Sequence, residues 1–143
     1  MAEQLIAVVD GARARYFSVA ARVTPSGEEK NKLVEVETLI NPAHRLKDGD
    51  LFSESGHGVD DKREAHTEEF DRKFAKLVLE RMAHLIRQKH VTYAILAAGP
   101  KMLGHLREHR HVLPRVDIGE LPKHLTELSP HELCLRLEAD ELI

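Results

Sequence analysis

Short apolar runs and alternating segments divide the first part of the chain into strands. A continuous run from Leu5 to Val9 leads directly into Asp10-Gly11, a dipeptide that strongly favours a tight hairpin turn. Side chains alternate with a period of two from Arg13 to Ala20 and again from Val34 to Ile40. The segment between them, Thr24 to Lys32, has the composition of an exposed turn. The pattern predicts three strands, of which the first two form a hairpin.

The second half of the chain alternates helix and strand. Apolar residues recur at three- and four-residue steps from Phe70 to Ile86, as in an amphipathic helix. The run from Tyr93 to Ala98 is typical of a central strand, and Gly99-Pro100 opens a helix through about His109. A weaker strand is predicted from Arg115 to Gly119, and a capping box starts the last helix at Ser129. We therefore expect a single α/β domain over residues 1–143, with a mixed sheet of four or five strands.

A long polar segment, Asn41 to His66, separates the third strand from the long helix. Loops beyond roughly 12–15 residues are uncommon in compact domains unless they are functional or disordered. Four basic residues stand against six acidic ones in this segment, so as a whole it does not attract RNA. The pair His44-Arg45 and the isolated Phe52 are its candidate contact residues. We expect the loop to contact a partner or to act as a tether.

Composition and charge narrow the classes of function. The formal net charge is −3, and the aromatic share of 4% without Trp makes a base-stacking platform improbable. Cys134 is the only cysteine, which excludes an intrachain disulfide and a cysteine-built zinc site and suits a reducing cytoplasm. The start of the chain is acidic where a signal peptide is basic, and no apolar run approaches the roughly 18 residues of a membrane span. We expect a cytoplasmic protein with no membrane contact.

Three stretches together resemble a known family. They are VVDGARARYF (Val8 to Phe17), ILAAGPKMLGHLR (Ile95 to Arg107) and LPKHLTELSP (Leu121 to Pro130). Their order and spacing resemble the bacterial host attachment proteins, described as "protein required for attachment to host cells", over about Gln4 to Leu137. That family is similar to the middle domain of class-one peptide-chain release factors and of the ribosome-rescue factor Pelota. The resemblance implies a ribonuclease H-like fold.

The long loop departs from these relatives. Release factors carry a Gly-Gly-Gln tip there that hydrolyses peptidyl-tRNA, whereas this chain reads Ser55-Gly56-His57-Gly58-Val59 and contains no Gly-Gly-Gln. The Asp-Arg-Pro-Gly-Arg type of run expected of host attachment proteins near Ser53 to His57 is also missing. The resemblance therefore implies a binding module that contacts the ribosome, RNA or a protein partner. It favours a non-enzymatic protein over an enzyme.

Asp10 is the first candidate for catalysis. It ends the first strand, where a ribonuclease H-like nuclease places a metal-binding carboxylate, although no partner acids stand out at other strand ends. The alternative is that Asp10 only makes the turn with Gly11. His44 and His57 leave ester or nucleic acid hydrolysis open, and Ser53 and Ser55 beside His57 leave nucleophilic catalysis open.

Two positively charged groups are candidate anion sites. Arg13 and Arg15 fall on one face of the second strand and suit a bidentate phosphate or carboxylate. Their structural alternative is cross-strand pairing with Glu35 or Glu37. The corner Gly99-Pro100-Lys101 follows the central strand and starts a helix, where α/β sheets often bind ligands. The alternative is that Gly99-Pro100 only ends the central strand and begins the next helix.

His105 and His109 lie four apart on one predicted helix, a spacing that can hold zinc. Arg107 and Arg110 would repel a cation there, and the macrodipole favours cationic side chains at a helix C-terminus in any case. We therefore predict no metal and no cofactor.

The leading hypothesis is a non-enzymatic, release-factor-like module that makes contact through the loop, the first hairpin and the Gly99-Pro100-Lys101 corner. A metal-dependent hydrolase using Asp10 is the first alternative. A role in attachment to host cells or surfaces, as the family description says, is the second, and the lack of an export signal argues against direct adhesion. A homo-oligomer stays open.

Overall fold

The computed structural model describes residues 3–43 and 60–143. Its elements, in chain order, are β1 (Glu3–Val9), β2 (Arg13–Val23), β3 (Glu29–Ile40), α2 (Asp60–Lys89), β4 (Val91–Ala98), α3 (Pro100–Glu108), the short 3₁₀ helix η1 (Arg110–Val112), β5 (Asp117–Leu121) and α4 (Pro130–Ala139).

The strands form one mixed sheet in the order β3-β2-β1-β4-β5. The first three strands make an antiparallel meander, and β4 and β5 run parallel to β1. The prediction of an α/β domain with a mixed sheet of four or five strands is confirmed. Because β1, β4 and β5 are parallel, the segments that follow them leave the sheet at the same edge.

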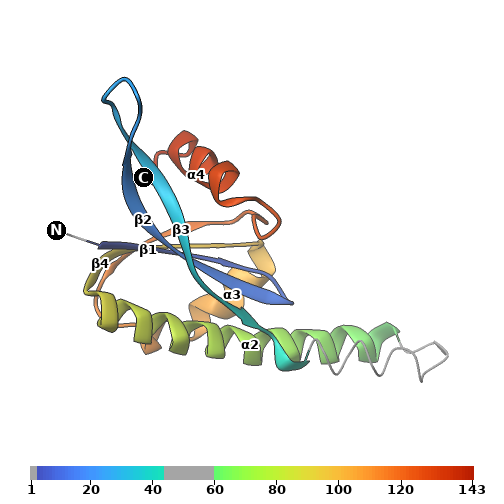
Figure 1. Cartoon of the computed structure of the whole chain (residues 1–143). Helices are drawn as coiled ribbons and strands as arrows, with labels where there is room; N and C mark the ends of the chain where they lie inside the picture. Colours follow the sequence, from blue (N-terminus) through green and yellow to red (C-terminus); the bar gives the residue numbers. More distant parts are fainter. Residues whose placement is uncertain (1–2, 44–59) are drawn as a thin grey trace.

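Helices cover both faces of the sheet, with α2 and α3 on one side and α4 on the other (Figure 1). Alternate residues of β1 enter the two cores, which explains why its sequence is apolar throughout. Leu5 and Ala7 pack in the core that contains α2 and α3. Ile6 and Val8 pack in the core that contains α4.

The largest differences from the sequence prediction are at two boundaries. The turn predicted over Thr24–Lys32 is shorter, because β3 already begins at Glu29. The loop predicted over Asn41–His66 ends earlier, because α2 begins at Asp60, ahead of the apolar periodicity that starts at Phe70. In both places the polar residues leave no hydrophobic period, although Lys and Glu are themselves good helix formers.

Two polar contacts join α2 to the sheet. The Tyr16 hydroxyl, in the buried core, donates a hydrogen bond of 2.8 Å to the Val78 carbonyl. The Arg81 guanidinium donates to both carboxylate oxygens of Glu37, at 2.5 and 2.7 Å. The hydrogen bonds from Arg81 hold the pKa of Glu37 below its ordinary value, and burial raises the pKa of Tyr16 above the usual range.

The Glu37–Arg81 contact predicts a pH dependence of stability. A carboxyl whose pKa is lower in the folded chain stabilises the fold above its unfolded pKa, near 4.5, and loses that contribution as pH falls through its folded value. Urea unfolding at pH 7 and at about pH 3.5 should therefore show a smaller acid loss in Glu37→Gln than in wild type. Glu80→Gln, which changes an exposed acid of α2, serves as the control and should behave like wild type. Identical acid losses in all three proteins would contradict the prediction.

Candidate functional site at the carboxyl edge of the sheet

Three connections meet where β1, β4 and β5 end. They are the Asp10 turn, the Gly99-Pro100-Lys101 corner and the segment 122–129 that leads to α4. Open α/β sheets commonly bind ligands at this edge, outside the carboxyl ends of their strands. We therefore take this edge as the candidate site.

The Asp10 carboxylate accepts hydrogen bonds from both sides of this edge. Its Oδ1 accepts from the backbone N–H groups of Ala12 and Arg13, at 2.7 and 2.8 Å, and so shapes the turn. Its Oδ2 accepts from the Thr126 hydroxyl at 2.5 Å. Thr126 is buried, so the side chain of Asp10 holds the first hairpin to the segment before α4.

Arg13 strengthens the same junction. Its Nη2 donates to the Thr126 carbonyl at 2.8 Å and lies 3.4 Å from Glu127 Oε1. The Glu127 side chain is 90% exposed, so that ion pair contributes little. The carbonyl contact is the more important of the two.

Arg15 makes the densest set of contacts. Its Nη1 donates to the carbonyls of Thr126 and Leu128, at 2.9 and 2.7 Å, and its Nε donates to Glu35 Oε1 at 2.7 Å. The guanidinium carbon also lies 5.0 Å from the centre of the Phe17 ring, a cation–π geometry. The hydrogen bond from Arg15 is the main cause that lowers the pKa of Glu35.

The structure thus brings Arg13 and Arg15 together, as their alternation predicts. It directs both guanidinium groups at backbone carbonyls, and Arg15 forms the cross-strand pair with Glu35, while Glu37 pairs with Arg81 of α2 instead. An anion-binding role for the two arginines stays a prediction.

Asn41 and Thr126 are residues of this junction that sequence reasoning missed. Asn41 is buried, and its Nδ2 donates to the Gly11 carbonyl at 2.9 Å while its backbone N–H donates to the Ala12 carbonyl. The turn also lies close to α2, because a Cβ on Gly11 would come within 2.9 Å of Asp71 Oδ1. The Asn-Pro dipeptide at 41–42 signals a strand end, but nothing local indicates its partners.

The Gly99 corner touches the same segment from the other side. A Cβ on Gly99 would lie 2.2 Å from Cε1 of His124. The imidazole therefore packs so close to the backbone of residue 99 that only glycine fits at this position. Pro100 is in the first turn of α3. This turn has no side-chain cap and contains no acidic residue. Lys101 Nζ lies 3.3 Å from Glu68 Oε1 in an ion pair. The three stretches that carry the family resemblance therefore meet at one edge.

The two histidines of α3 and its C-cap have different surroundings. His105 is buried, and its Nε2 has no hydrogen-bond partner among the residues that the structure describes. His109 caps the end of α3, with its ring centre 6.3 Å from that of His111. Within residues 3–43 and 67–143, no group of three or more His, Cys, Asp or Glu side chains is placed to hold a metal ion.

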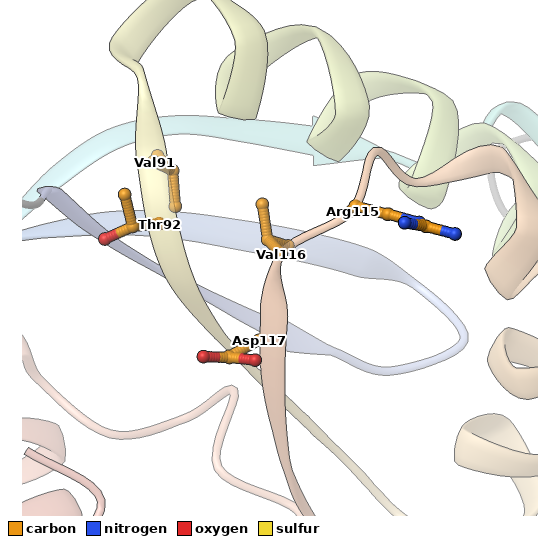
Figure 2. A pocket seen from close by; sticks show the side chains of 5 residues that line it. All are labelled: Val91, Thr92, Arg115, Val116 and Asp117. Atoms are coloured by element: carbon orange, nitrogen blue, oxygen red, sulfur yellow. The ribbon is translucent and has the colours of Figure 1, made fainter.

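A shallow, open pocket of about 440 Å³ lies at the opposite edge, where β4 and β5 begin. Its lining is Val91, Thr92, Arg115, Val116 and Asp117 (Figure 2). The charged side chains of Arg115 and Asp117 extend in different directions and do not converge (Figure 2). No sequence pattern pointed to this pocket, because its residues come from the start of β4 and from the approach to β5, two segments that meet only in the fold.

Three predicted contact residues and one catalytic candidate fall on a part of the chain that the structure does not describe. His44, Arg45, Phe52 and His57 lie in 44–59, outside the described residues. Their roles stay predictions. Among the helices described, none is both long and apolar enough to cross a membrane.

We predict that Asp10 contributes mainly to stability. Asp10→Ala removes an acceptor of three hydrogen bonds and leaves the buried Thr126 hydroxyl without its partner, which should cost about 2–3 kcal/mol of unfolding free energy in urea titrations. Asp117→Ala removes an exposed acid at the start of β5 and should change stability by less than about 0.5 kcal/mol. Equal stabilities of the two variants would refute this role of Asp10.

Comparisons with known proteins place the chain in a family. A search of curated proteins finds no match. Among solved structures, RuvC of Thermus thermophilus matches at 11% identity over 94% of this chain and 77% of that chain, with a TM-score of 0.33 that is too low to support an argument. The model of a family described as "Protein required for attachment to host cells" matches residues 5–137. Because this match spans nearly the whole chain, the protein belongs to that host attachment family.

Proposed function

We propose that this domain is a non-enzymatic binding module, similar to the middle domain of release factors, that contacts the RNA of the translation machinery. The observation that carries the proposal is the set of hydrogen bonds that the Asp10 carboxylate accepts. This carboxylate already accepts three hydrogen bonds from the turn and from Thr126, which leaves it poorly suited to a hydrated metal ion. With no Gly-Gly-Gln in the chain, neither of the catalytic devices implied by the resemblance is supported.

The sheet supports the ribonuclease H-like part of the proposal. The mixed sheet, an antiparallel meander followed by two strands parallel to the first, agrees with the elements that the resemblance implies: a hairpin, a third strand, a long helix and a central strand. Helices on both faces agree with it. The three stretches that carry the resemblance meet at the carboxyl edge, so the likeness concerns a single region in space.

A metal-dependent hydrolase remains the catalytic alternative to this proposal. It needs several carboxylates that converge on one ion, and the part of the chain with described side chains holds no such group. Metal-dependent hydrolysis by the wild type that disappears in Asp10→Asn, with the fold retained, would favour the alternative.

The family description supports a second candidate function, a role in attachment to host cells. It differs from the first in the place where the protein acts. Fractionation of native cells followed by immunodetection separates the two, because a binding module of the translation machinery remains with the ribosomes, whereas an adhesin reaches the cell surface.

Co-sedimentation with purified ribosomes tests the leading proposal. The full chain should pellet with ribosomes at about 50 mM salt and largely dissociate at about 200 mM, because phosphate contacts weaken steeply with salt. Lys101→Ala should pellet like Lys76→Ala, which removes an exposed lysine in the middle of α2, whereas a loss specific to Lys101→Ala would assign the contact to the corner. A chain that stays in the supernatant at low salt would count decisively against the proposal.

A further inference from the structure

The β2–β3 hairpin extends beyond the rest of the sheet. The pairing of β1 with β2 ends at Leu5 opposite Ser18, whereas β2 and β3 continue to pair from Val19 opposite Leu33 to Val23 opposite Glu29. Residues 19–33 therefore form a two-stranded ribbon, the hairpin arm, which projects past the sheet on the side away from α2 (Figure 1). A two-stranded ribbon of this kind is only marginally stable by itself. We therefore ask which of its side chains stabilise it and which do not.

The two faces of the hairpin arm differ in character. Val19 and Leu33 pack into the core beneath α4, and Cys134 Sγ of α4 lies 3.4 Å from the Asn31 carbonyl oxygen. Because side chains alternate along a strand, Arg22, Lys30 and Lys32 belong to the opposite face, and all three are exposed. Glu29, opposite Val23, falls on the α4 face. The uncovered face of the arm is therefore cationic.

Among the residues with described side chains, none of these three cations forms an ion pair with an acid, although the charge of Arg22 acts on the Cys134 thiol of α4 and favours its thiolate. Most other basic side chains there form ion pairs, namely Arg13, Arg15, Arg72, Lys73, Arg81, Lys101, Arg107, Arg110, Lys123 and Arg136. Arg22 lies directly opposite Lys30 across the ribbon. Like charges in that position destabilise a strand pair, so stability of the arm does not account for them.

We propose that the hairpin arm binds the phosphate backbone of RNA, an inference that rests on the proposed function and assigns its contact surface. Lys30 and Lys32 are two residues apart on one strand, roughly 6.7 Å, so their ammonium groups can each contact a different phosphate of one nucleic acid strand. The arm contains no aromatic residue, so it lacks the aromatic anchors that are common in protein interfaces. Contacts of this kind position a nucleic acid without reading its sequence.

The test compares two variants that lose the same number and type of charges. The arm variant carries Arg22→Ala, Lys30→Ala and Lys32→Ala. The control variant carries Lys76→Ala, Arg87→Ala and Lys89→Ala, which removes two lysines and one arginine from α2. Circular dichroism should show that both fold, because the arm residues are exposed and alanine is the best helix former at the control positions.

Fluorescence anisotropy of a labelled RNA duplex gives the readout from about 50 to 200 mM salt. Wild type and control should give a slope of log affinity against log salt that is steeper by about 2.7 than the slope of the arm variant, as expected for three phosphate contacts. The arm variant should also bind at least about tenfold more weakly at the lower salt. Equal affinities and slopes in the arm and control variants would overturn the inference.

Other occupants are outcomes of the same assay. Arm-dependent binding of polyglutamate, of anionic vesicles or of a DNA duplex, without binding of RNA, would overturn the assignment to RNA. Ribosome co-sedimentation separates this inference from the proposed function. If the arm variant pellets like wild type, the inference fails while the proposed function stands, whereas failure of the wild type itself to pellet removes the proposed function.

Discussion

The hydrogen bond between the Asp10 carboxylate and the Thr126 hydroxyl joins two parts of the chain that are 116 residues apart. It connects the turn after the first strand to the segment that leads into the last helix, and the guanidinium groups of Arg13 and Arg15 bind the carbonyls of that same segment. Because the β5–α4 segment also lies against Gly99, these contacts hold together all three connections at the carboxyl edge. The placement of α4 over its core depends on this junction.

This constraint shapes what the carboxyl edge can do. In many α/β proteins the side chains at such an edge are free to hold a ligand, whereas here an acid, two arginines and a buried threonine satisfy one another. Recognition is then left to surfaces whose charges have no internal partner. The cationic face of the hairpin arm is such a surface, and the proposed contact with RNA follows from it.

The sequence predicted the elements that a local pattern encodes. The apolar run before Asp10-Gly11 and the capping box at Ser129 both gave the right element, since each signal lies within a few residues. The start of β3 at Glu29 was missed, because the residues from Glu29 to Lys32 are polar on both faces of the arm and carry no hydrophobic alternation. Asn41 and Thr126 were missed as site residues because their partners are distant in sequence and depend on the finished sheet.

The central claim is that the carboxyl edge is structural and that recognition takes place on the hairpin arm. Backbone amide NMR with isotope-labelled protein and an unlabelled RNA duplex tests both parts in one titration. The account predicts shift changes along the arm, at Arg22, Lys30 and Lys32, with the amides of Ala12 and Arg13 unchanged at the Asp10 turn. Changes that concentrate at Ala12, Arg13 and Lys101 while the arm stays unchanged would contradict it.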